Sequence, residues 1–120
     1  MNLRYVADQI EAGAKVGWGK KESLKILDNY GIDLGWSSRN GYIEIVKLLL
    51  EAGADVHEEE DFPLRTACSN DQSEIVQVLL EAGADINARY CYAMNTTERE
   101  GFTKTYNVLN DWLIKIAQSV

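Results

Sequence analysis

The sequence has 120 residues, of which 46% are hydrophobic and one is proline, so its composition favours a single folded domain over a disordered chain. The formal net charge is −7, and residues 41–85 carry eleven acidic and two basic side chains, a local balance of −9. This charge disfavours direct binding to nucleic acid or an anionic membrane, and it favours either a partner with a basic surface or no charged partner at all.

The N-terminus and the cysteines indicate a cytoplasmic location. Asp8 and Glu11 interrupt the apolar stretch that a signal peptide requires, and no run reaches the roughly 18 apolar residues of a membrane span. Cys68 and Cys91 have no paired spacing, which is typical of reduced cytosolic thiols.

The segment 1–31 predicts two helices, over residues 3–12 and 21–30, joined by a glycine-rich and lysine-rich connector. The connector is not a phosphate-binding loop, because five residues instead of four separate Gly13 from Gly19 and no hydroxyl residue follows the lysine. Trp18 lies in this connector, and two interpretations are open: it packs over the N-terminal helices, or it contacts a partner. The pattern does not decide how the two helices fit the register of the rest of the chain.

Residues 70–83 repeat the pattern of residues 40–53, so that Asn70 aligns with Asn40 and Gly83 with Gly53. Each copy has apolar residues at helical spacing, and each ends in its glycine, where a helix needs a left-handed cap. A shorter helix is predicted over Phe62–Cys68, with its proline in the first turn and small residues at its end for close packing. One such helix pair cannot bury its apolar face alone, so the pairs must stack.

The C-terminal segment carries a degraded third copy, residues 100–109, which continues into an amphipathic helix. The apolar residues expected on its buried face are Tyr106, Leu109, Trp112, Leu113 and Ile116. Two interpretations are open for this helix: it shields the last core face of the stack, or it docks a partner or a second copy of the chain.

These patterns resemble the ankyrin repeat. Phe62–Cys68 is similar to the family's T-P-L-H-x-A-A opening, and Gly41–His57 is similar to its G-H-x-E-V-V-x-L-L-L-x-x-G-A-D-V-N segment, whose end recurs at Gly83–Asn87. The family period is about 33 residues, and here it is 30, which resembles repeats of large DNA viruses. The missing residues fall in the β-hairpin connector, so a short finger is expected. Phe62 and Arg65 replace the opening threonine and histidine, which puts the usual hydrogen bonds of those side chains in question.

The resemblance implies an all-α ankyrin-repeat solenoid that occupies residues 1–120 as one domain. The expected units are an irregular N-terminal cap over residues 1–31 and repeats over residues 32–61, 62–91 and 92–120, the last with the C-terminal helix.

No catalytic, cofactor or metal site is predicted. His57 with the two cysteines lacks zinc-ligand spacing, and Cys68 replaces a core alanine, so it should be buried and unreactive. The acidic run Glu58–Asp61 lacks the alternating ligands and central glycine of a calcium loop. Two interpretations of this run are open, a solvated tip and a contact for a basic partner.

The resemblance implies a non-catalytic module that binds a protein through its connector tips and the exposed ends of its short helices. This basis predicts the following partner-binding residues: His57, Glu58, Glu59, Glu60, Asp61, Arg89, Tyr90, Tyr92, Arg39, Asn40, Ser69 and Asn70. Trp18 is added to them because of its place in the N-terminal connector.

Two functional hypotheses are compatible with these features. In the first, the chain binds, and blocks or sequesters, a protein partner, as a viral protein acting on a host factor would. In the second, it is an acidic nucleic-acid mimic that occupies the basic cleft of a nucleic-acid-binding or defence protein. The mimic predicts competition with DNA or RNA and a steep loss of binding in salt.

Overall fold

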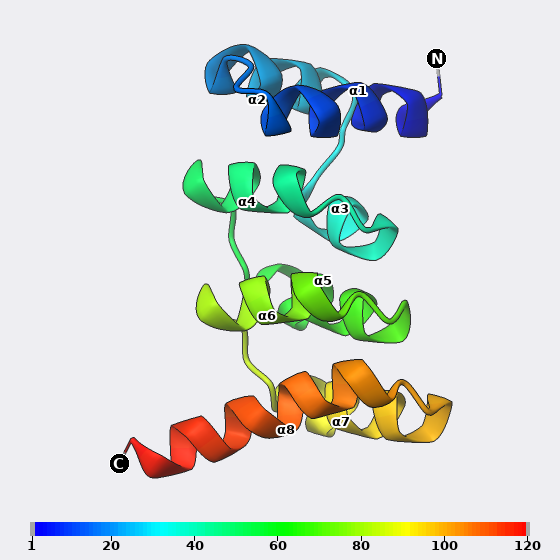
Figure 1. The fold of residues 1–120 in the computed structure, drawn as a ribbon, viewed down its shortest axis with the longest axis vertical. Helices are drawn as coiled ribbons and strands as arrows, with labels where there is room; N and C mark the ends of the chain where they lie inside the picture. The colour runs from blue at the N-terminus through cyan, green and yellow to red at the C-terminus, as the bar shows by residue number, and fades with distance from the viewer. Residues whose placement is uncertain (1, 120) are drawn as a thin grey trace.

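The computed structural model describes residues 2–119, and this part of the chain forms eight α-helices and no β-strand. In chain order they are α1 (Leu3–Lys15), α2 (Lys20–Asn29), α3 (Leu34–Asn40), α4 (Ile43–Glu51), α5 (Glu58–Ser69), α6 (Ser73–Glu81), α7 (Ala88–Glu100) and α8 (Thr103–Gln118). Consecutive helices pair, and Figure 1 shows the pairs stacked as layers along the longest axis, with the two termini at opposite ends. Within residues 2–119, no helix combines the length and the apolar character that crossing a bilayer requires. The predicted all-α solenoid is confirmed.

The sequence repeat corresponds to the spacing between stacked helix pairs. In one row α3 contacts α5 and α5 contacts α7, and in a second row α4 contacts α6 and α6 contacts α8. Val46 and Val76, one period apart, are both fully buried between the layers. Ala67 and Cys68 are also fully buried, as expected, because small side chains let α5 approach its neighbours closely.

The predicted glycine stops end α4 and α6. Gly53 and Gly83 have φ angles of 94° and 101°, a conformation that costs glycine little. The next residue closes each helix: the N–H of Ala54 donates to Leu49 O and the N–H of Ala84 donates to Leu79 O, both at 3.0 Å. The chain then leaves each helix in the same direction, which sets the place of the next connector.

The connectors differ from the β-hairpin expected from the family pattern. In α5, Glu59–Asp61 have φ between 49° and 58°, and in α7, Arg89–Cys91 have φ between 55° and 60°. Each connector is therefore a short left-handed turn that leads into the right-handed part of the helix. We call residues 54–61 the first finger and residues 84–91 the second finger. The prediction that they would be short holds for a different physical reason, because a single turn replaces a hairpin.

The N-terminal helices agree with the predicted pair, although α1 extends to Lys15. Helix α2 ends as α4 does, with the N–H of Ile32 donating to Leu27 O at 2.9 Å, and it packs beside α4. It therefore takes the place of a second-row helix. Its closing glycine, Gly31, lies closer along the chain to Gly53 than Gly53 lies to Gly83, because α2 runs into α3 without a finger.

Helix α1 closes the first layer by capping α4. Both carboxylate oxygens of Glu11 accept backbone hydrogen bonds, from Glu44 N–H and Ile45 N–H, each at 2.9 Å. These donors belong to the first turn of α4, whose own N-cap residue, Tyr42, supplies no side-chain bond. The hydroxyl of Tyr42 instead donates to Asp8 of α1 at 2.7 Å. The cap is thus held by directed polar contacts as well as by apolar burial.

Helix α8 packs against α6 and α7, with Leu109 fully buried. The expected burial of Ile116 is wrong: it is 44% exposed, because α8 has 16 residues against nine in α6 and its last turns pass beyond the stack. Figure 1 shows this end of α8 projecting from the last layer. The packing fits the capping interpretation, and docking through the projecting end stays a prediction.

Candidate partner-binding face

The first finger is tied to the second through a buried carboxylate. Asp61 is only 4% exposed. Its Oδ1 accepts a hydrogen bond from Nδ1 of His57 at 2.9 Å, and its Oδ2 accepts one from the N–H of Asp85 at 2.7 Å. The sequence groups Asp61 with the solvated and partner-contacting residues of the acidic run, and its burial removes it from both groups. It links one repeat to the next.

Arg65 holds the left-handed turn of the first finger. Its Nε donates to Glu60 O at 3.0 Å and its Nη2 donates to Glu59 O at 2.9 Å. Its guanidinium carbon also lies 5.6 Å from the ring centres of Phe62 and Tyr92. Non-glycine residues in this conformation cost roughly 1–2 kcal/mol each, and these bonds offset part of that cost.

The second finger has the same backbone conformation as the first, but the side chains that hydrogen-bond to it are an amide and a thiol. The side-chain amide of Asn95, one period after Arg65, donates to Tyr90 O at 3.1 Å. The thiol of Cys91 donates to Asn87 Oδ1 at 3.5 Å, at the positions equivalent to Asp61 and His57. Both fingers are therefore preorganised by side chains of their own repeat.

The tips of the fingers meet at an ion pair beside an exposed aromatic ring. Arg89 Nη1 lies 2.9 Å from Glu60 Oε1 and joins the two fingers. Tyr90, at the end of the second finger, is 95% exposed. We call the exposed side chains of His57, Glu59, Glu60, Arg89 and Tyr90, with the edges of Phe62 and Tyr92, the finger face.

A family model described as ankyrin repeats (3 copies) matches residues 16–90. The chain belongs to the ankyrin-repeat family. The match includes α2 as well as the two well-formed repeats, in line with the second-row position of that helix. A search of curated proteins found no match. Ankyrin repeats are typically non-catalytic, and they indicate that the chain is a protein–protein interaction module.

The departures from the ankyrin motif now have a structural account. Arg65 and Asn95 occupy the position of the family's histidine, and both bond to carbonyls of the finger that precedes them. Phe62, in place of the opening threonine, packs its ring against the backbone of Gly35, where a side chain would collide with it. Sequence reasoning identifies Phe62 and Arg65 only as departures, and it misses Asn95. The signal that could have found it is the recurrence of hydrogen-bonding side chains one period apart.

The other predicted site residues on the short helices serve mainly the scaffold. The amides of Asn40 and Asn70 donate to Trp36 O and Thr66 O, both at 2.8 Å, at the C-terminal ends of α3 and α5. The hydroxyl of Ser69 hydrogen-bonds that of Tyr92 at 2.8 Å. Arg39 is exposed at this same end of α3, away from the finger tips.

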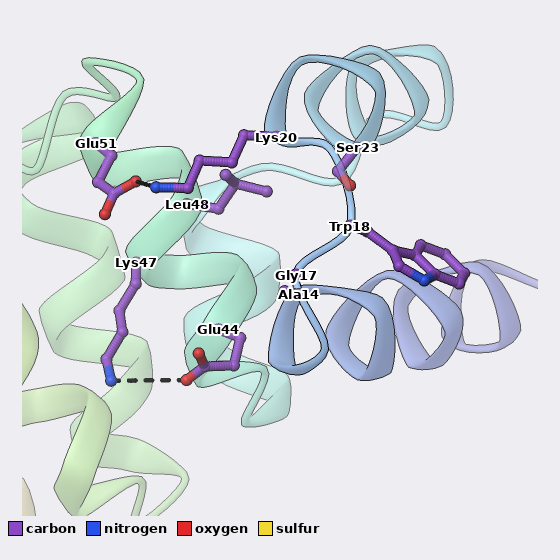
Figure 2. Close-up of a pocket in the computed structure, with 9 residues that line it drawn as sticks. All are labelled: Ala14, Gly17, Trp18, Lys20, Ser23, Glu44, Lys47, Leu48 and Glu51. Atoms are coloured by element: carbon purple, nitrogen blue, oxygen red, sulfur yellow. Dashed lines mark hydrogen bonds and ion pairs between the residues drawn. The ribbon is translucent and has the colours of Figure 1, made fainter.

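Trp18 packs on the cap and stays 50% exposed. Its ring covers Gly13 of α1 so closely that a Cβ at that position would overlap it. Figure 2 shows the indole extending along α1, away from two ion pairs in the hollow between the cap and α4. These pairs are Lys20 with Glu51 at 2.8 Å and Lys47 with Glu44 at 3.6 Å. Packing over the cap is therefore observed, and partner contact by the exposed half of the ring stays a prediction.

The thiol of Cys68 and the other possible metal ligands give no indication of a reactive site in the described part of the chain. The thiol of Cys68 is buried as predicted, and burial raises its pKa to about 12, so it stays protonated at neutral pH. Within residues 2–119, no group of three or more His, Cys, Asp and Glu side chains is arranged to hold a metal ion.

Proposed function

We propose that the chain binds a protein partner through the finger face, with Tyr90 as its central anchor. The observation that supports this proposal most strongly is the exposure of the Tyr90 side chain, which is 95%. The backbone that carries this ring is held in place by a hydrogen bond from Asn95 to Tyr90 O. Tyrosine supplies a large contact area at a small entropic cost, and aromatic side chains that fill a partner's pocket carry much of the binding energy of interfaces. A rigid finger adds to this advantage, because little backbone freedom is lost on binding.

The charges around Tyr90 favour a partner with a basic surface. Arg89 already pairs with Glu60. Arg65 is half-buried, and its guanidinium is directed toward two rings and two backbone carbonyls instead of toward solvent. Glu59 is exposed beside them. The chain would act stoichiometrically, by occupying the surface of its partner. The period of 30 residues resembles that of repeats in large DNA viruses. Proteins of the cells that such viruses infect are therefore the first partners to screen.

The test measures affinity for a partner isolated by affinity purification, with Tyr90→Ser against Tyr5→Ser as a matched control. Tyr5 is 58% exposed on α1, away from the fingers. We expect Tyr90→Ser to weaken binding by about 30-fold or more and Tyr5→Ser to leave it unchanged. Equal affinities of the wild type and Tyr90→Ser would overturn the proposal. Competition by DNA, with binding lost steeply in salt, would support the nucleic-acid mimic instead.

A further inference from the structure

A notch lies beside the first finger, on the side that faces α2. It has a volume of about 360 Å³ and is lined by the end of α2, the start of α3, the end of α4 and the base of the finger. Leu34, Leu49 and Ala54 contribute apolar surface to it, and four carboxylate side chains also line it. It lies outside the finger face defined above.

The notch exists because one finger is missing from the stack. Between the two repeats that have fingers, the first finger lies against the second and Asp61 bonds to its base. Helix α2 joins α3 directly, so in the described part of the chain no finger covers the base of the first one. The equivalent positions show the effect: Ala84 and Leu79 are buried, whereas Ala54 and Leu49, one period earlier, are partly exposed. Positions that the finger of the preceding unit covers in the second repeat are left open in the first.

The charge of the notch identifies what would fit it. Its carboxylates come from three segments, Asp28 of α2, Asp33 at the start of α3, and Asp55 and Glu58 of the first finger, and none of the described residues that line it is basic. Burial, followed by the charge of Asp33, raises the pKa of Glu58. A cation would relieve this repulsion, and an anion would increase it.

We propose that the notch receives an apolar-and-basic segment of a protein partner, with an aliphatic side chain against Ala54 and Leu49 and an arginine or lysine among the carboxylates. This inference rests on the proposed protein-binding function and adds a second subsite to it. The apolar floor separates this occupant from a simple cation, because an arginine stem or a neighbouring leucine buries surface that a metal ion cannot cover.

The probe is the peptide acetyl-Ala-Leu-Arg-Leu-Arg-Ala-amide, titrated into the ¹⁵N-labelled full chain. We expect saturable amide shifts at Gly35, Ala54 and Asp55, with a dissociation constant on the order of 1 mM. Peptides with citrulline or glutamate in place of both arginines should bind about tenfold more weakly or worse, because charge-assisted hydrogen bonds are lost.

Two kinds of variant test the site itself. Ala54→Leu fills the floor, and Asp28→Asn/Glu58→Gln removes two charges without changing shape; both should weaken binding about tenfold. Glu81→Gln/Asp111→Asn removes two charges elsewhere and should leave binding unchanged. Equal binding of the glutamate peptide, or unchanged binding to both notch variants, would overturn the inference. The Tyr90→Ser variant should still bind the peptide, because Tyr90 does not line the notch. A failure of peptide binding therefore contradicts the notch proposal alone, and the Tyr90→Ser affinity measurement tests the finger face.

Discussion

Equivalent residues in the two fingers meet the same local requirement with different chemistry. A side chain four residues before the end of each turn bonds to the last left-handed residue. The first finger uses an imidazole and a carboxylate, His57 and Asp61. The second uses an amide and a thiol, Asn87 and Cys91. The first pair contains the only histidine of the sequence, so the first finger should respond to pH near neutrality.

His57 should make the chain less stable as pH rises. The hydrogen bond to Asp61, and then the charge of that carboxylate, raise the pKa of His57 above its ordinary value of 6.5. The folded state therefore binds this proton more tightly than the unfolded state, and the contribution is fully present below pH 6.5. It is lost as pH rises through the raised pKa, where the folded imidazole also becomes neutral.

Urea unfolding between about pH 6 and pH 9 measures this effect. The wild type should lose stability as the pH rises from 6.5 through the raised pKa of His57, and His57→Asn should remove this dependence, since asparagine stands at the equivalent position of the second finger. His57 is the only histidine in the sequence, so no other imidazole can produce the slope. A slope that persists in His57→Asn would contradict the assignment.

At the scale of elements, the sequence predicted the repeated helices and missed the conformation of the fingers, whose residues differ between the repeats. The helices were predictable because apolar residues at helical spacing and a terminal glycine occur twice, in α4 and α6. The left-handed turns were not, because glutamate, arginine, tyrosine and cysteine, which make up all but one position of the two turns, carry no signature of that conformation, unlike glycine or asparagine. The run Glu58–Asp61 indicated a solvated tip, and nothing in it marks the one carboxylate that turns inward. The place of α2 needed the structure, since the missing finger breaks the register.

The contact between α1 and its connector gives a prediction in which the effect of one substitution changes sign. Gly13 lies inside α1, where alanine is normally better by about 0.5–1 kcal/mol. A Cβ there would overlap the ring of Trp18. We expect Gly13→Ala to destabilise the chain by about 1–3 kcal/mol, because the ring must leave its position.

In a Trp18→Ala background, the same Gly13→Ala change should stabilise by about 0.5–1 kcal/mol, because only the helical preference remains. Urea unfolding of the four chains measures the coupling as a double-mutant cycle. Equal effects of Gly13→Ala in both backgrounds would show that the indole does not pack on α1 in solution.

At the scale of the whole molecule, stability is a sum over neighbouring layers, because each layer contacts only the next. Polar bonds join the layers as well as apolar contacts. Thr105 Oγ1 donates to Asp71 at 2.6 Å, and Asp61 accepts from the N–H of Asp85. The last layer also carries polar residues where the preceding repeat is apolar: Glu98 and Asn110 stand one period after Cys68 and Leu80. The stack therefore presents a more polar surface at its final layer than between its layers.

Asp61→Ala should uncouple the last layers from the rest. It leaves the N–H of Asp85 without its acceptor and places alanine in a left-handed conformation, so we expect a loss of about 2 kcal/mol or more. Asp61→Asn is the matched control, because its amide oxygen still accepts the bond and asparagine tolerates the backbone. In native-state hydrogen exchange, Asp61→Ala should lower amide protection in α7 and α8 roughly tenfold more than in α3 and α4. Uniform loss of protection along the chain would instead mean that the stack unfolds as one unit and that Asp61 stabilises it without linking particular layers.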